Sequence, residues 1–159
     1  MVLQKVIDSV LCIDDAVRGW LGLSAKWVVN LLDALDREVD EETRVKVLES
    51  CGRRCIGGGF LKKAAAIAKK SKSTEEFLDG LGKVWKHLHV GKDEVFVVYE
   101  RCYCPLVKGY EGKMSPSFCN CSVGWIKELF ETALKKPVKV EKMGTIKQGN
   151  KQCEFKIRI

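Results

Sequence analysis

The hydrophobic pattern of this 159-residue chain changes its period near residue 92. Before that point, apolar residues recur at the three- and four-residue spacing of one face of an α-helix. After it, apolar and polar residues alternate over residues 138–141 and again over 153–159, as in strands with one buried face. A single helix-like stretch, 122–134, interrupts this second half. The change predicts an α+β fold in which N-terminal helices pack on a small antiparallel sheet.

The length of the chain fits one domain. A chain of this size can bury about 70% of the surface that its unfolded form exposes, so it needs no disulfide or metal to fold. The sequence contains no repeat, linker or low-complexity segment. We therefore expect a single domain over residues 1–159, with a helical part over 1–91 and a part over 92–159 that holds the sheet, one helix and a cysteine motif.

Capping residues mark two helix starts in the first half. Asp40, followed by two glutamates, predicts an N-cap because acidic groups stabilise the first turn of a helix. Ser73, with a glutamate three positions later, has the form of a capping box and predicts a helix that continues to near Gly91. Three glycines from Gly57 predict a break between these helices.

Three strands are predicted in the second half. Residues 95–99 are β-branched and aromatic, a composition typical of strands. Residues 138–146 and 153–159 alternate and flank a turn at Gly149, so we expect them to pair as an antiparallel hairpin.

The net charge of +7 raises the question of a nucleic-acid partner. Part of the excess lies on the outward side of a predicted helix around residues 64–68, and no aromatic-interleaved basic stripe accompanies it. We interpret these lysines as a solvated helix face and expect no nucleic-acid partner. They are Lys62, Lys63, Lys69, Lys70 and Lys72.

The sequence contains no candidate membrane segment. No apolar run approaches the ~20 residues of a spanning helix. Lys5 and Asp8 interrupt the stretch that would form the apolar core of a signal peptide. We therefore expect a cytoplasmic protein whose thiols stay reduced.

The chain has eight cysteines, and six of them occur as three close pairs: Cys51/Cys55, Cys102/Cys104 and Cys119/Cys121. In a reducing compartment, such pairs favour metal binding or catalysis over disulfides, although disulfides would fit a hyperthermophilic source. The other two cysteines, Cys12 and Cys153, lie on apolar stripes, and we expect both in the core.

Each pair can present two sulfur atoms together. The first pair is spaced i, i+4 on a predicted helix, where it would point inward. The second pair follows the predicted strand 95–99, and side chains two apart share one face of a continuing strand. Cys119 and Cys121 directly precede the predicted helix 122–134, whose N-terminal partial charge would lower the pKa of both thiols.

The six paired cysteines favour a shared zinc site. Thiolates are soft ligands, and zinc takes four of them in structural sites, so at least two of the six would not be ligands. Reduced functional thiols and ordinary core cysteines remain alternatives, and an iron–sulfur cluster has no spacing pattern here. His87 and His89 could complete a site, but we interpret them as surface or capping residues.

Five short motifs lie along the second half of the chain: Cys104-Pro105, the run from Cys119 to Trp125, Phe130-Glu131, the run from Pro137 to Glu141 and the run from Gly149 to Phe155. With these motifs, residues 95–159 resemble the 4-vinyl reductase (hydrocarbon-binding) domain family. The doubled cysteines and the Gly-Trp step are also similar to the L-2-amino-thiazoline-4-carboxylic acid hydrolase family.

This resemblance implies a fold shared with the TRAPP vesicle-tethering subunits and, more distantly, with haem-based nitric oxide sensors. In that fold, helices on a twisted antiparallel sheet can enclose an apolar ligand cavity. The resemblance also implies a homodimer and zinc-binding cysteines. No haem-ligating histidine can be carried over to this chain.

We therefore expect a protein that binds a small apolar or aromatic molecule and carries a structural zinc. Cys104 and Cys121 are the preferred ligands, joined by two from the remaining paired cysteines. Trp125, Phe118 and Tyr103 are candidate cavity or rim residues.

Two alternatives remain open. One is a hydrolase for a small thiazoline-type cyclic substrate, with zinc-activated water or a thiolate of Cys119 or Cys121 as nucleophile. Its nearest general bases would be Glu100 and Glu111, and neither is adjacent to the cysteines in the sequence. The other is a zinc-stabilised interaction subunit, which depends on fold analogy alone.

Overall fold

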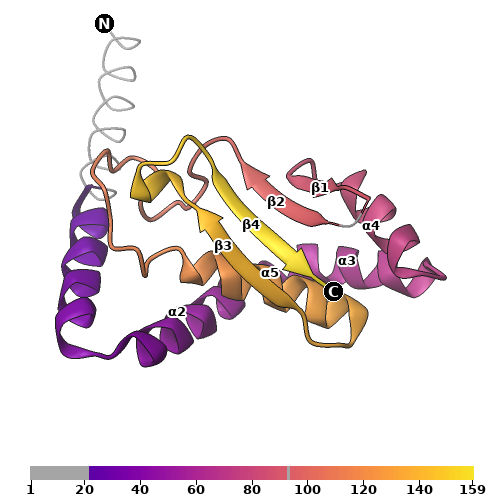
Figure 1. Ribbon diagram of the computed structural model, residues 1–159, viewed down its shortest axis with the longest axis horizontal. Coiled ribbons are helices and arrows are strands. Elements are labelled where there is room, and N and C mark those ends of the chain that lie inside the picture. The colour runs from indigo at the N-terminus through magenta and orange to yellow at the C-terminus, as the bar shows by residue number, and fades with distance from the viewer. Residues whose placement is uncertain (1–21, 93) are drawn as a thin grey trace, which may run out of the picture.

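The computed structural model describes residues 22–92 and 94–159 (Figure 1). The predicted helix around Cys12 lies outside these residues. A helix over residues 22–38 comes first. The elements that follow are α2 (Glu41–Cys55), α3 (Gly58–Lys70), α4 (Thr74–Gly82), β1 (Leu88–Val90), β2 (Val95–Tyr99), α5 (Asn120–Leu134), β3 (Lys139–Gly144), the 3-10 helix η1 (Ile146–Gln148) and β4 (Cys153–Arg158).

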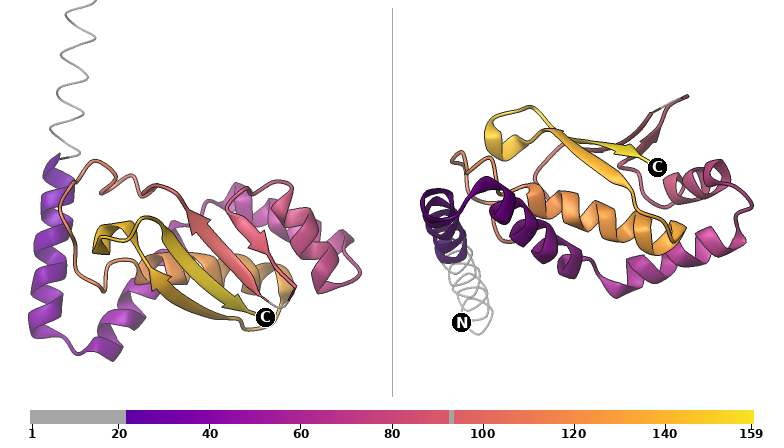
Figure 2. Two further views of the ribbon diagram at one scale, coloured as in Figure 1. Left: turned by 45° about the horizontal axis from the view of Figure 1, so that its top comes forward. Right: turned by 60° about the horizontal axis from the view of Figure 1, so that its bottom comes forward.

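The strands form one antiparallel sheet in the order β1-β2-β4-β3. Its central register pairs Val97 with Phe155, and Val140 pairs with Ile157 at the β3–β4 edge. Helix α5 packs on this sheet, and α2 and α3 pack in turn on α5 (Figure 2). The predicted α+β fold, with helices on a small antiparallel sheet, is confirmed.

The main core lies between the sheet and the helices α4 and α5. Phe77, Phe130 and Phe155 are completely or almost completely buried there, and the first two meet edge to face with ring centroids 6.0 Å apart. On β4, the predicted alternation is confirmed as far as Ile157, which is buried, whereas Ile159 is exposed.

Both predicted helix caps are present. The Asp40 side chain accepts a hydrogen bond of 2.9 Å from the Thr43 backbone N–H, and the Ser73 hydroxyl accepts one of 3.2 Å from the Glu76 N–H. Each cap satisfies a backbone donor that the helix itself leaves unpaired. Gly57 separates α2 from α3, as predicted.

Two predicted boundaries are wrong. The helix expected to reach Gly91 ends at Gly82, and Leu88 begins the edge strand β1, which pairs with β2. Pairing with a neighbouring strand here outweighs the helical spacing of the apolar residues. The strand expected to continue through Ile146 ends at Gly144 after a register shift, and η1 leads into Gly149, whose φ of 99° suits glycine.

A second, smaller core lies beside the first. One face of the helix over residues 22–38 packs through Ala25 and Leu32 against the loop that connects β2 to α5. That loop contributes Val107, Met114 and Phe118, all of which are buried. This loop also carries Cys102 and Cys104, which pack against the same cluster.

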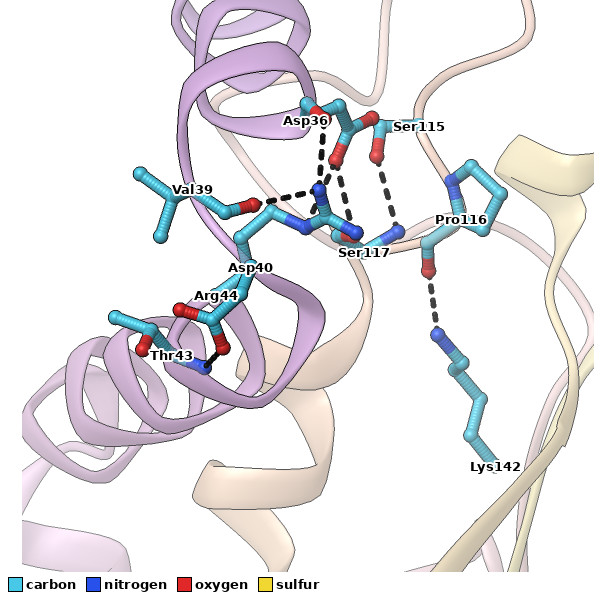
Figure 3. Close-up of polar contacts among 9 residues, drawn as sticks. All are labelled: Asp36, Val39, Asp40, Thr43, Arg44, Ser115, Pro116, Ser117 and Lys142. Carbon is cyan, nitrogen blue, oxygen red and sulfur yellow. Dashed lines mark hydrogen bonds and ion pairs between the residues drawn. The ribbon is translucent and has the colours of Figure 1, made fainter.

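Arg44 fastens this loop to the corner between the first described helix and α2 (Figure 3). Its guanidinium donates to the backbone carbonyls of Asp36, at 2.8 Å, and Val39, at 2.9 Å. The Asp36 carboxylate lies 3.3 Å from Arg44 Nε and accepts a hydrogen bond of 3.1 Å from the Ser117 hydroxyl. The corner and the loop are therefore held as one unit.

The surface agrees with the expected solvated lysine face. The five lysines at and just beyond α3 are all exposed: Lys62, Lys63, Lys69, Lys70 and Lys72. Within the described ranges, no helix combines the length and apolar character needed to cross a membrane.

Candidate functional site

The candidate site is organised by a very close crossing of α2 over the start of α5. A Cβ atom at Gly52 would lie 1.8 Å from the Cys121 carbonyl oxygen, and one at Gly124 would lie 1.9 Å from the Glu49 carbonyl oxygen. Two glycines, one on each helix, thus let the two backbones touch. The contact fixes the last turn of α2 beside the first turn of α5, where Cys121 lies.

Ion pairs between the same two helices flank this crossing. Arg53 on α2 lies 3.0 Å from Glu128 and 2.8 Å from Glu131 on α5. In the opposite direction, Lys127 on α5 lies 2.7 Å from Glu49 on α2. All of these side chains are partly buried, so the pairs are screened by solvent less than surface pairs are. They fix the position of α2 along α5.

Three segments of the chain bring their cysteines to this crossing. Cys55 ends α2, Cys104 lies in the loop after β2, and Cys121 lies in the first turn of α5. Burial, together with the neighbouring sulfur atoms of Cys119, Cys104 and Cys55, raises the pKa of Cys121 to about 12. Burial also raises the pKa of Cys104, and Cys102 and Cys55 add to the effect. These thiols are therefore close enough to influence one another.

The backbone after Cys104 acts against the effect of burial. The N–H groups of Leu106 and Val107 lower the pKa of Cys104, although burial raises it more. The Val107 N–H itself donates to the Cys104 carbonyl oxygen at 3.2 Å. Because β2 ends at Tyr99, Cys102 and Cys104 lie in a loop rather than on a continuing strand.

Cys119 and Cys153 extend the group toward the sheet. Burial, together with the neighbouring Cys153, raises the pKa of Cys119 to about 11, and Thr145 partly offsets the rise. Cys153 lies in the core as expected, and its sulfur accepts a hydrogen bond of 3.4 Å from the Ile146 N–H.

The expectation that the start of α5 lowers the pKa of Cys119 and Cys121 is wrong. Cys119 occupies the N-cap of α5, yet burial raises the pKa of both thiols. Removing a thiolate from water costs more here than the partial charge of the helix terminus returns. At neutral pH both residues are therefore thiols, unless a cation binds.

The pair Cys51/Cys55 does not point inward as predicted. Both side chains are exposed, and Gly52 is the residue of this turn that faces α5. Cys55 still lies within electrostatic range of Cys104 and Cys121. In the part of the chain that the structure describes, no three His, Cys, Asp or Glu side chains are already arranged to hold a metal ion. The zinc site over these cysteines stays a prediction.

A buried histidine lies beside the cysteine loop. His87 is buried between the rings of Tyr99 and Tyr103, with centroids 4.9 Å from each. Its Nδ1 atom has no hydrogen-bond partner and lies 3.8 Å from the Glu100 carboxylate. Burial strongly raises the pKa of Tyr99. Both histidines were expected at the surface or at a helix cap; His89 on β1 is exposed, whereas His87 is buried.

Sequence reasoning identified neither the burial of His87 nor its contact with Tyr99. The sequence did offer one signal. Tyr103 lies between Cys102 and Cys104, so an aromatic ring accompanies these two cysteines wherever the loop packs. Of the three candidate rim residues, Tyr103 is 40% exposed above His87, and Phe118 is buried in the second core.

The third candidate rim residue, Trp125, belongs to an aromatic cluster. Its ring centroid lies 5.8 Å from that of Phe60 on α3 and 5.5 Å from that of Trp85. It therefore packs against the main core. Two hollows lie elsewhere, on either side of Val90 at the sheet edge, and both open to solvent.

This geometry describes a small α+β protein with a cysteine-rich junction between two helices and a loop. A family model matches residues 19–159, and the chain belongs to that family, DUF6144, which is described as a family of unknown function. The comparison with curated proteins gave no match. The resemblance to the 4-vinyl reductase family and the homodimer that it implies remain predictions.

Among solved structures, the chain is similar to the crystal structure of the phenol-responsive sensory domain of the transcription activator PoxR with phenol. The two share 11% sequence identity with a TM-score of 0.45, and the match covers 84% of this chain and 73% of that one.

Proposed function

We propose that this protein binds a small apolar or aromatic molecule and that a zinc ion on its thiol cluster stabilises the binding fold. The observation that carries the proposal is the convergence of Cys55, Cys104 and Cys121 from three separate segments. A metal ion bound there would link α2, the loop after β2 and α5. A fourth ligand would come from Cys102 or Cys119.

Zinc would remove an electrostatic conflict within this cluster. Cys104, Cys119 and Cys121 are partly or fully buried, and each disfavours ionisation of its neighbours. Zinc binds thiolates, and its double charge offsets their mutual repulsion. The backbone N–H groups of Leu106 and Val107, which lower the pKa of Cys104, favour the same ionised form.

The metal would also act on the candidate ligand region. Tyr103 lies between Cys102 and Cys104, and its ring covers His87. A bound metal would therefore position the loop that brings Tyr103 over His87, whose Nδ1 is buried without a hydrogen-bond partner. A ligand that displaced the Tyr103 ring would meet the apolar face of Tyr99 and this one nitrogen, which suits an aromatic molecule with one polar group.

The hydrolase alternative is less well supported. It needs a thiolate nucleophile or an open zinc site with a general base. Burial keeps Cys119 and Cys121 in the thiol form at neutral pH. Glu100 lies beside His87, but it accepts from Tyr103 at 3.5 Å rather than from a cysteine.

Metal analysis of protein purified without added metal tests the zinc proposal. We expect about one zinc per chain. Cys55→Ser should lose most of it, whereas Cys51→Ser, one turn earlier on the same helix, should retain it. A zinc content below about a tenth of one ion per chain, with every thiol freely titratable in the native protein, would contradict the proposal.

Saturation-transfer NMR with benzyl alcohol and toluene tests the ligand region. Benzyl alcohol combines a ring with one hydroxyl group, so we expect it to give the stronger signal. His87→Ala should remove that preference, and His89→Ala, at an exposed position on β1, should keep it. If neither compound shows saturation transfer to zinc-loaded protein, or if both variants behave alike, this assignment is wrong.

A further inference from the structure

The helix over residues 22–38 is apolar on two opposite faces. Its inner face packs on the second core through the buried residues Ala25 and Leu32. The opposite face carries three large exposed side chains, here called the outer stripe: Leu23 (67% exposed), Trp27 (63%) and Leu31 (41%). A helix that is apolar all round is normally covered all round, so this face is suited to a partner.

The spacing of the outer stripe fits helix-to-helix packing. Its members are four residues apart, so they form one continuous ridge along the helix. Packing of such ridges against each other is the commonest way in which two helices meet. The helix lies at one end of the molecule, away from the sheet (Figure 2), so a second copy can approach it.

The charges beside the stripe point to a second copy of the same helix. Lys26 and Asp33 are both exposed and, seven residues apart, lie on the same side of the helix. When two identical helices pair antiparallel about a twofold axis, the same side of each helix meets. Lys26 of one copy then lies level with Asp33 of the other on one flank of the pair, and the reverse pair forms as well.

The stripe and the charges define the same register. For Lys26 of one copy to lie level with Asp33 of the other, the twofold axis must pass between residues 29 and 30. An axis at residue 29 places Trp27 of one copy opposite Leu31 of the second, so the two requirements agree to within half a residue. A parallel arrangement would instead place Lys26 beside Lys26 and Asp33 beside Asp33, which like charges disfavour.

We propose that two copies of this chain pair through the outer stripe, with their helices antiparallel about a twofold axis near residue 29. The interface does not involve the thiol cluster, so its test is independent of the proposed zinc and ligand. Trp27 is its central anchor, as tryptophan is in many interfaces.

Sedimentation of the full chain tests the pairing. We expect a dimer for the wild-type protein and for Val47→Glu, which changes an exposed apolar residue on α2 instead. Trp27→Glu should weaken the dimer at least about thirtyfold, with an unchanged far-ultraviolet circular dichroism spectrum because the side chain is exposed. A monomeric wild-type chain, or a dimer unaffected by Trp27→Glu, overturns the proposal.

Charge reversal tests the register. Lys26→Asp and Asp33→Lys should each weaken the dimer about tenfold, and the double variant should restore it, because it recreates both pairs with reversed sign. A double variant that is weaker than either single variant excludes the antiparallel arrangement. If the chain is monomeric and acrylamide fails to quench Trp27, residues before 22 cover the stripe, which also overturns the proposal.

Discussion

Gly52 and Gly124 are the residues at which adding a single methyl group should most lower the stability of the fold. An alanine normally stabilises a helix relative to glycine by about 1 kcal/mol. At these positions the added methyl group would lie 1.8 Å or 1.9 Å from a backbone oxygen of the other helix, so the helices must separate. Backbone atoms cannot rotate away as a flexible side chain can.

We expect Gly52→Ala and Gly124→Ala each to lower the free energy of unfolding by about 1–3 kcal/mol in urea titrations. Gly59→Ala is the matched control, since Gly59 lies in α3 with nothing within 4 Å of its Cβ position. That variant should be neutral or slightly stabilising. Equal effects at all three positions would show that the close crossing does not limit stability.

The buried thiols predict how the stability of metal-free protein depends on pH. Burial raises the pKa of Cys119 to about 11 and of Cys121 to about 12, from an ordinary 9.0. Above pH 9 the unfolded chain loses these protons while the folded chain keeps them. The stability is therefore complete below pH 9 and falls as the pH rises toward 11.

The slope should reach about 1.4 kcal/mol per pH unit for each thiol. Unfolding measured in chelator from about pH 8 to 10.5 checks this. Cys121→Ala should reduce the slope and Cys51→Ala should not. A flat profile would mean that the two thiols are as accessible to solvent as in the unfolded chain.

At the scale of single residues, the sequence predicted that cysteines from separate segments lie near one another, but not how they are arranged. Cys104 and Cys121 do influence each other, and their role as ligands stays a prediction. The side of α2 that faces α5 could not be predicted from apolar spacing, because its central contact is Gly52, which has no side chain. Nor could the pKa of Cys121, since burial by distant segments decides it.

Among the elements, the corner between the first described helix and α2 depends on Arg44. Its guanidinium, only 16% exposed, joins Asp36 to the backbone of Val39, and Asp36 in turn holds Ser117 (Figure 3). Removing Arg44 leaves these acceptors without their donor. Such partly buried groups cost about 1–3 kcal/mol when left unpaired.

We expect Arg44→Met to lower stability by that amount and to speed amide exchange over residues 104–118. Lys46→Met on the same helix is the control, because its ion pair with Glu42 is almost fully exposed. Unchanged exchange in the loop with Arg44→Met would show that the second core alone holds the loop in place.

The predicted elements were most accurate where a local signal decides the structure. Asp40 and Ser73 were correctly identified as caps because capping needs only the neighbouring backbone. The strand β1 was missed because Leu88 continues a helical spacing, and only its pairing with Val97 makes it a strand. That pairing joins two segments on either side of a turn, and the spacing of apolar residues around Leu88 gives no indication of it.

For the whole molecule, the proposed zinc would unite the two cores. Cys102, Cys104 and Cys119 belong to the second core, while Cys55 and Cys121 lie at the α2–α5 crossing. A metal that binds only the folded chain stabilises it by about 4 kcal/mol at a thousandfold excess over its dissociation constant.

We therefore expect chelation to lower the thermal midpoint and added zinc to restore it. Calorimetry of the same sample before chelation, after chelation and after re-addition checks this. In Cys55→Ser the effect of chelation should largely disappear. A midpoint that chelation leaves unchanged in protein shown to contain zinc would place the metal outside the folding unit.

The contact between Trp85 and Trp125 has an optical consequence. Two indole rings with centroids 5.5 Å apart and planes tilted by 48° couple their electronic transitions. The coupling should give an exciton couplet in the circular dichroism spectrum that neither ring produces alone. The couplet should vanish in Trp125→Phe. The chain thus contains a label-free reporter of whether α5 is seated on the core, separate from the fluorescence of Trp27 at the molecule's edge.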